Sequence, residues 1–563
     1  MAFHCTLDQL PVELLHTLFT YFSSSELLYT FYHVSDYVIA SLQSYSSYQL
    51  DFKSISKSNF RCICRHVQPE QVISLTLSDS NDTPGQSELF FNRFRMEQFT
   101  RLRSLTLVEI EFNSLESIFL NLSKLHELRS FSFDAYSIRH IYGVMDLNSI
   151  KKLEQINNML RNTYAQVFPQ LNYLCLNGDW VLDTIPLPNI LHLKLEHCPL
   201  DKLATIADLA PKLRSLDACV DVPQMNSYDI ILSSQLTRVR LIMKDFTVSM
   251  NYMEYILSNR LYLKHLELHL KGFEDLADGQ RWQRLTSSLQ TFNFKFNIQL
   301  DSIEQILNTF RTLFWLKKKQ WFVAYQDKCL FSLPFFAPKH IDTSCQMPIY
   351  STAPNDTVFY ENVTQLSLST SKKIIKYFTH INTLKLEDKI SQQELLRFVN
   401  LRYVKHLVIL SLDDLLQFTP IECKIPQLRQ LTIENKITRK EIEKMMCNSY
   451  EQIRTLEISI ILQDQNHIVD ELLRLFSHTE HFIYNSDIQS IQTMVRFIDG
   501  FKHLSSASFI SQGPLYNQPQ HFRYNQDLII LKTNRIKYGI STCRIYYLPD
   551  SKSLFCINWW IEE

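Results

Sequence analysis

One short apolar pattern recurs along most of this 563-residue chain. The pattern is apolar-x-x-apolar-x-apolar, and within two blocks, 171–294 and 363–509, its copies return at steps of about 24 residues. Alternation over its last four positions predicts a short strand with one buried face. The copies begin at Val72, Leu102, Leu128, Leu171, Ile190, Leu213, Leu236, Leu263, Leu289, Val363, Ile381, Val404, Leu428, Ile453, Thr479 and Leu504.

The segments between the copies carry helical spacing. Leu115, Ile118, Phe119 and Leu122 fall on one face of a helix. A unit of one strand and one helix cannot cover its own apolar face, so neighbouring units must stack to form a continuous core. The sequence therefore predicts an α/β fold in which a curved parallel sheet carries outer helices, which is a solenoid. Unrelated α/β strands at chance spacing are the alternative.

The pattern resembles the leucine-rich-repeat family, whose fuller signature is LxxLxLxx[N/C]xL. The copy from Ile190 to Leu200 matches that signature in full, with Cys198 at the polar position. The resemblance implies a leucine-rich-repeat solenoid. Its first block would span residues 60–295 and its second block residues 363–512.

The first fifty residues do not follow the repeat. Pro11 precedes an apolar stripe at helical spacing, and proline is well tolerated where a helix starts. Ser23 and Glu26 have the spacing of a capping box at the start of a second helix. A third short helix follows near Tyr37. Three helices of this size cannot bury the stripe internally, so we expect a partner to cover part of it.

Residues 10–42, LPVELLHTLFTYFSSSELLYTFYHVSDYVIASL, resemble an F-box. This resemblance implies an F-box-like helical domain over residues 1–50 that docks the Skp-type adaptor of an SCF ubiquitin ligase and, through it, cullin and RING proteins. The alternative is an ordinary helical cap on a solenoid. The residues that the resemblance places against the adaptor are Leu10, Pro11, Leu14, Leu15, Leu18, Phe19, Leu27 and Leu28.

Residues 296–362 interrupt the repeat. The alternating segments that begin at Trp321 and Cys329 predict a β-hairpin. A second hairpin is expected within 513–563, from Cys543 and from Leu554 around Pro549–Lys552, and we expect it to close the open end of the solenoid. Lys317–Lys319, between two tryptophans, is either an aromatic and basic nucleic-acid patch or a solvated helix end, and the neutral chain favours the helix end.

Composition excludes several function classes. The 57 basic and 58 acidic residues create no global field for nucleic acid or an anionic membrane. The 8 glycines never form G-x-G or a P-loop, so dinucleotide and nucleotide chemistry is not expected. No apolar run reaches the length of a membrane span, and the 12 scattered cysteines fit a reduced cytoplasmic or nuclear protein.

Catalytic motifs are missing as well. Cys62-x-Cys64-x-His66 offers three potential zinc ligands without a fourth, and alternating positions on a buried strand explain this spacing better. There is no GxSxG or HExxH motif. We therefore expect no catalytic residues, metal or cofactor, and no enzyme in its own right.

The residue between the last two apolar positions of each copy faces away from the predicted core. In the middle of the chain this column carries charges of both signs, which suits a polypeptide ligand of mixed charge. The alternative is a merely solvated sheet face. The predicted function is a substrate receptor of an SCF-type ligase, and the alternative is a binding scaffold with no ubiquitin link. The candidate substrate-binding residues are Lys194, Asp217, Arg240, Glu267, Lys385 and Glu457.

Overall fold

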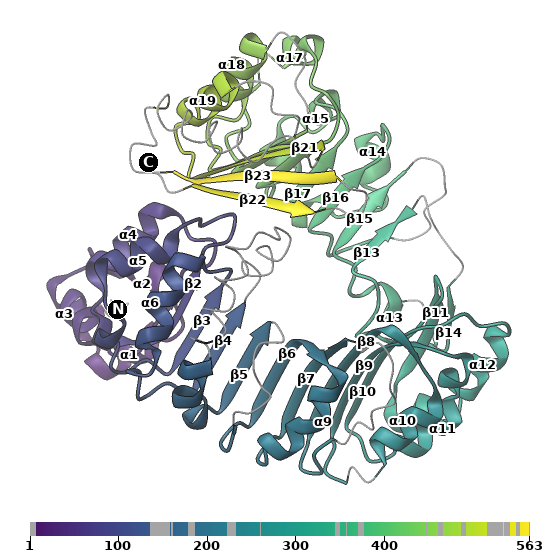
Figure 1. Cartoon of the computed structure of the whole chain (residues 1–563). Helices are drawn as coiled ribbons and strands as arrows, with labels where there is room; N and C mark the ends of the chain where they lie inside the picture. The colour runs from purple at the N-terminus through teal and green to yellow at the C-terminus, as the bar shows by residue number, and fades with distance from the viewer. Residues whose placement is uncertain are drawn as a thin grey trace, which may run out of the picture. The chain divides into compact units, whose positions relative to one another are not determined.

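The computed structural model describes residues 7–134, 158, 161–177, 186–221, 232–258, 261–343, 349–355, 357–369, 377–445, 448–459, 465–485, 491–514, 533, 541–547 and 552–561. These residues form a mixed α/β fold with large, mostly parallel sheets (Figure 1). The chain divides into two units. The first comprises Met1–Asn189, Glu480–Phe482 and Ser486–Glu563, and the second comprises Ile190–Thr479 and Ile483–Asn485.

The first unit begins with three helices and continues as alternating strands and helices. Strands β1 to β5 pair in parallel, each with the next along the chain. The elements are α1 (Val12–Phe19), α2 (Ser24–Phe31), α3 (Asp36–Ser44), β1 (Tyr48–Asp51), α4 (Lys57–His66), β2 (Val72–Ser78), α5 (Gln86–Arg93), β3 (Ser104–Val108), α6 (Phe112–Leu122), β4 (Ser130–Asp134) and β5 (Tyr173–Asn177), then α19 (Ile491–Gly500), β21 (Ser506–Pro514), β22 (Ser541–Tyr547) and β23 (Lys552–Trp560).

The first part of the second unit holds strands β6 to β10, which also pair in parallel in chain order. Three antiparallel strands continue the sheet in the order β12-β11-β14. The elements are β6 (His192–Pro199), α9 (Leu200–Leu209), β7 (Ser215–Asp221), β8 (Arg238–Val248), α10 (Met250–Leu257), β9 (His265–Gly272), α11 (Gly279–Leu285), β10 (Thr291–Asn297), α12 (Ile303–Thr309), the π-helical turn η7 (Phe314–Lys319), β11 (Phe322–Gln326), β12 (Cys329–Leu333) and β14 (Tyr350–Ser351).

A second parallel sheet follows in the same unit, in the order β13-β15-β16-β17-β18-β19. Its connecting helices are short, mostly four residues. The elements are β13 (His340–Asp342), α13 (Thr357–Tyr360), β15 (Gln365–Leu368), β16 (Thr383–Leu386), α14 (Gln392–Leu395), β17 (His406–Ile409), α15 (Asp413–Leu416), α16 (Ile421–Lys424), β18 (Gln430–Ile433), α17 (Arg439–Lys444), β19 (Thr455–Ile458) and α18 (Gln465–Leu475), and β20 (His481–Asn485) comes next along the chain.

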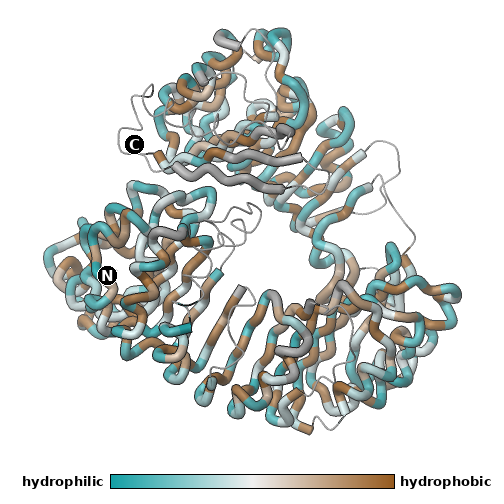
Figure 2. Tube along the Cα trace, in the orientation of Figure 1, coloured by the Kyte–Doolittle hydropathy of each residue, from teal (hydrophilic) through white to brown (hydrophobic). Residues whose placement is uncertain are grey.

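All sixteen apolar copies contain a strand, so this prediction is confirmed. Except for β2, which begins at Val72 itself, each of these strands begins at the third residue of its copy, because the first apolar residue anchors the turn that leads into the strand. Buried and accessible residues alternate along strands such as β3 and β9. Figure 2 shows the same alternation of hydrophobic and hydrophilic residues along the trace. Leu266 of β9 and its neighbour Phe292 of β10 are both buried, in register.

Helices cover the buried face of the sheet. Leu115, Ile118, Phe119 and Leu122 of α6 are at most 1% exposed, as their spacing predicts. In the second unit, helices α10 to α12 lie beside strands β8 to β10 (Figure 1), where Trp282 packs its ring against Phe292 and Phe296. Each such side chain contributes about 1.5–3 kcal/mol when it leaves water.

Two local predictions are wrong. The segment with Cys62, Cys64 and His66 is helix α4 and not a buried strand, because Phe60, Ile63 and Cys64 follow helical spacing toward the core. The sheet also begins earlier than the first predicted strand at Val72, since β1 starts at Tyr48, near the end of the segment 1–50 that was expected to form a helical domain. The tyrosine and leucine of β1, Tyr48 and Leu50, are both buried.

Both expected hairpins form. β11 and β12 pair antiparallel around Asp327 and Lys328, two residues with positive φ angles of 51° and 59°. β22 and β23 pair antiparallel near the C-terminus; of the predicted turn at 549–552, residues 549–551 lie outside the described residues and Lys552 begins β23. β23 also pairs antiparallel with β21, so the hairpin joins a sheet edge.

Candidate functional site

The three N-terminal helices build one small core. Ser23 caps α2 through the predicted capping box: its hydroxyl accepts from the Glu26 amide, while its own amide donates to the Glu26 carboxylate at 2.9 Å. Phe19 of α1 packs against Phe31 of α2 and Tyr45 after α3, with ring centroids 5.6 Å apart in both pairs. The Ser24 hydroxyl donates to the Gln49 carbonyl, which attaches the helices to β1.

This core divides the predicted adaptor-binding residues into two groups. Leu15, Phe19, Leu27 and Leu28 are at most 3% exposed, so they pack in the helical core and leave little surface for a partner. Their assignment as adaptor-binding residues stays a prediction. Leu10, Pro11, Leu14 and Leu18 remain accessible to different degrees, and Leu14 is 54% exposed.

Hydrogen bonding and helix capping hold the backbone near the accessible residues Leu10 and Pro11 in place. Pro11 stands at the N-cap of α1, where its missing N–H leaves no helical hydrogen bond unmade. The Tyr37 hydroxyl of α3 donates to the Leu10 carbonyl at 2.7 Å. Tyr37 is itself 39% exposed, so it adds an aromatic ring near this surface. We call Leu10, Pro11, Leu14, Leu18 and Tyr37 the N-terminal apolar surface.

Four of the predicted substrate-binding residues form one row across adjacent strands of the second unit. Lys194 of β6 is in register with Asp217 of β7, Asp217 with Arg240 of β8, and Arg240 with Glu267 of β9. The row continues to Asn293 of β10. Residues in register on neighbouring strands point to the same face of a sheet. We call this set the charged row.

Arg240 binds two carboxylates at once. Its Nη1 lies 3.1 and 3.2 Å from the two carboxylate oxygens of Asp217, and its Nε donates to Glu267 at 2.7 Å. His269, two residues along β9, also contacts the Glu267 carboxylate at 3.1 Å. Burial raises the pKa of Glu267, but hydrogen bonds from His269 and Arg240 outweigh it and leave that pKa below its ordinary value. The row is therefore an internally paired ionic network.

Lys194 and the two remaining candidates have other partners. Lys194 pairs with Glu196 of its own strand at 2.9 Å. Lys385 of β16 pairs with Glu434 at 2.9 Å, and Glu457 of β19 accepts from the Thr432 hydroxyl at 3.0 Å. Lys385 and Glu457 belong to one row of the second sheet, but Val408 and Thr432 stand between them. The structure does not bring these two residues together.

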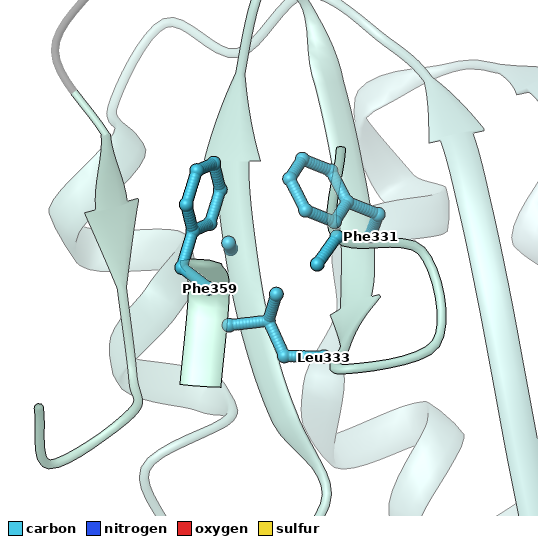
Figure 3. Close-up of a cluster of buried hydrophobic side chains, with 5 residues drawn as sticks. Phe331, Leu333 and Phe359 are labelled. Carbon is cyan, nitrogen blue, oxygen red and sulfur yellow. The ribbon is translucent and has the colours of Figure 1, made fainter. Parts of the chain in front are cut away.

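The sequence did not predict an apolar layer beside the charged row. Phe331 of β12 is in register with Lys295 of β10, so its ring lies on the face that carries the charged row. Figure 3 shows Phe331, Leu333 and Phe359 pointing toward one another, and all three are buried. Phe336 packs against this cluster and meets the His269 ring edge-on, with centroids 4.6 Å apart. The insertion at 296–362 thus supplies an aromatic border to the charged row, which sequence alternation could not reveal.

The basic run at 317–319 packs in part against neighbouring aromatic rings and backbone of the same chain. Trp315 is fully buried, and the Lys319 ammonium lies 4.9 Å from the ring centre of Trp321. Lys319 also donates to the Leu289 carbonyl. This lysine therefore contacts the protein's own aromatic rings and backbone.

The described residues contain no group of three His, Cys, Asp or Glu side chains placed to hold a metal ion. Burial raises the pKa of Cys64 to about 12, and the His66 ring packs on Tyr32 with centroids 4.0 Å apart. None of the described helices is long and apolar enough to cross a bilayer. No family model matches this sequence, and no curated protein matches it either.

Proposed function

We propose that this chain is a non-catalytic substrate receptor of an SCF-type ubiquitin ligase. Its N-terminal helices would act as an F-box that binds a Skp-type adaptor. Its strand-and-helix repeats would form a leucine-rich-repeat solenoid that holds a target protein. Ubiquitin transfer would then be carried out by the cullin and RING partners, and the chain itself would contribute only positioning.

The solenoid part of the proposal is supported by strand order and spacing. From β6 to β10, each strand pairs in parallel with the next strand along the chain, and the same holds from β15 to β19. Most steps are about 24 residues long, and a described helix returns the chain between β6 and β7, from β8 to β10 and from β16 to β19. Stacked units of this kind share one continuous core and leave the opposite sheet face free for a ligand.

The F-box part depends on one observation, the exposure of Leu14. Leu14 is 54% exposed although the next residue, Leu15, is fully buried in the helical core. A leucine that points outward from a short, well-packed helix beside Leu10 and Pro11 is a suitable anchor for a helix-in-groove contact. Its burial by a partner would contribute about 1.5–3 kcal/mol before association costs.

Co-purification with a Skp-type adaptor tests this proposal. Leu14→Asp should weaken adaptor binding at least about tenfold, because a buried carboxylate without a partner opposes the contact. Leu120→Asp is the matched control, since Leu120 is 63% exposed on α6, outside the N-terminal apolar surface. Full binding by the Leu14 variant, or equal loss in both variants, would refute the docking assignment.

A binding scaffold without a ubiquitin link is the second candidate. It is favoured by the way the helices attach to the sheet: the Gln71 side chain donates to the Tyr45 carbonyl at 2.9 Å and Ser24 donates to the Gln49 carbonyl at 2.7 Å. A cap that protects the first strand of a repeat array would need the same contacts. Absence of adaptor and cullin from a complex captured with the wild-type chain would select this candidate.

A further inference from the structure

The face that carries the charged row has more polar residues than the row alone. One row toward the strand starts contains His192, Ser215, Arg238, His265 and Thr291, in register from β6 to β10. The next row on the other side includes Ile242, His269 and Lys295. We call these three rows the polar face.

The charges on the polar face divide into paired and unpaired groups. The carboxylates Glu196, Asp217 and Glu267 each bind a cation of the same face, namely Lys194 or Arg240. Arg238 and Lys295 are exposed, and neither forms an ion pair with any residue that the structure describes. The same is true of Lys271, at the end of β9.

The charge available to a ligand on this face is therefore positive. The carboxylates already bind cations within the protein, so a ligand that displaced them would lose the energy of existing ion pairs. Unpaired cations gain most from an anionic partner, since electrostatic complementarity sets both orientation and association rate. This differs from the mixed-charge ligand that the sequence column alone suggested.

The aromatic border limits the polar face on the side of the insertion. Phe335 is 50% exposed and stacks edge-on against Phe336 with ring centroids 4.8 Å apart. Phe336 in turn contacts His269 on the polar face. An exposed phenylalanine supported by a buried cluster offers a rigid apolar contact at the border of the face that carries the unpaired Lys295 and Arg238.

We propose that the polar face binds an acidic segment of a protein, with a large apolar side chain of that segment placed on Phe335 and Phe336. This inference rests on the proposed role of the sheet as a target-binding surface, but it does not depend on the N-terminal helices. Arg238 and Lys295 supply the attraction, and the network around Arg240 keeps the intervening surface fixed.

Peptide binding to the purified full-length chain tests the inference. The first probe is a labelled decapeptide of alternating glutamate and alanine with phenylalanine at both ends. The second has lysine in place of glutamate, and the third has alanine in place of the terminal phenylalanines. The glutamate probe should bind, its affinity should fall with rising salt, and the lysine probe should not bind.

Charge reversal identifies the site. Arg238→Glu with Lys295→Glu should weaken the glutamate probe about tenfold or more, since two attractive contacts become repulsive. Arg284→Glu with Lys318→Glu is the matched control, because it changes net charge equally at exposed residues outside the polar face. Phe335→Ser should abolish the advantage of the phenylalanine-ended probe over the alanine-ended one.

Three results would overturn the inference: equal binding of the glutamate and lysine probes, equal loss in both double variants, or tighter binding of a single-stranded oligonucleotide than of the glutamate probe. The last result would indicate a nucleic-acid surface instead. Because no adaptor is present in this assay, its failure leaves the Leu14 experiment unaffected. Loss of adaptor docking would likewise leave the peptide result standing.

Discussion

The ammonium group of Lys57 donates to the carbonyl oxygen of Trp560 at 3.3 Å, across 503 positions of sequence. Lys57 lies in α4 and is only 2% exposed, and Trp560 ends β23 and is 1% exposed. Phe60, one turn further along α4, meets the Trp560 ring with centroids 5.3 Å apart. The Asn558 side chain of β23 donates to Asn81 at 2.9 Å. The last strand is thus fixed to the beginning of the first unit.

Lys57 should make the first unit more stable toward unfolding as the pH rises through the alkaline range. Burial, with a smaller effect of Arg61, lowers the pKa of Lys57 to about 8 from an unfolded value of 10.5. Between these two values the unfolded chain holds a proton that the folded chain has released, so raising the pH favours the folded state. Relative to Lys57→Met, the wild type should gain thermal stability between pH 8 and pH 10.

The measurement is the melting temperature of both proteins at several pH values. Lys57→Met keeps the length of the side chain and shares every other titrating group with the wild type, so the difference between the two curves isolates Lys57. A difference that stays constant from pH 7 to pH 10 would mean that folding does not lower the pKa of Lys57.

Much of this fold follows from the sequence because strand alternation is a local signal. The copies at Leu102 and Leu263 predict their strands directly, and the neighbouring apolar residues face the core in register. Such a signal fails where two periods coincide. Cys62, Cys64 and His66 are spaced by two residues, as on one face of a strand. Phe60 and Cys64 are also one helical turn apart. Both are buried on the same side of α4, so tertiary packing favours the helix.

The candidate site was predictable only in part. Register could be inferred for Asp217, Arg240 and Glu267, because equal positions in successive copies become neighbours in a parallel sheet. The division between exposed Leu14 and buried Leu15 depends on how three helices pack, which adjacent leucines do not reveal. The aromatic border depends on the antiparallel pairing of β12, in the insertion, with β10 of the repeat block, and no repeat fixes that pairing.

Because Leu15 is buried and Leu14 is exposed, substitution of Leu15 should affect stability, whereas substitution of Leu14 should affect binding. Leu15→Ala should destabilise the helical core by about 2–5 kcal/mol, since Leu15 is fully buried and its truncation leaves a cavity. Leu14→Ala should change stability by less than about 0.5 kcal/mol, because Leu14 is 54% exposed. Urea unfolding followed by circular dichroism distinguishes the two, and equal destabilisation by both variants would contradict the packing described here.

The buried hydrogen bonds of Asp79 should contribute as much to the free energy of unfolding as an apolar core residue does. Asp79 is fully buried, and its carboxylate accepts from the backbone amides of Ser87 at 2.7 Å and Glu111 at 2.9 Å. In Asp79→Asn one oxygen becomes an amide group that faces a donor, so we expect a loss of about 1–3 kcal/mol. The control is Glu88→Gln, which makes the same chemical change at an exposed position of α5. Similar unfolding midpoints for the two variants would show that the network contributes nothing.

The ion pairs of the charged row should contribute less to stability at acidic pH, because Glu267 becomes protonated. The pKa of Glu267 lies below its ordinary value of 4.5, because hydrogen bonds from His269 and Arg240 outweigh the effect of burial. On acidification the unfolded chain takes up this proton first, so ionised Glu267 stabilises the folded state above pH 4.5 and this contribution is lost as the pH falls further.

Arg240→Met should therefore cost about 1 kcal/mol near neutral pH and progressively less as the pH falls below 4.5, because protonation of Glu267 removes its attraction for Arg240. Melting temperatures of both proteins between pH 7 and pH 3.5 measure this convergence. Arg311→Met removes a more exposed ion pair with Glu304 and serves as the control for loss of one arginine. If the wild type and Arg240→Met differ equally at every pH, Arg240 does not bind an ionised Glu267, and the paired network on the polar face is absent.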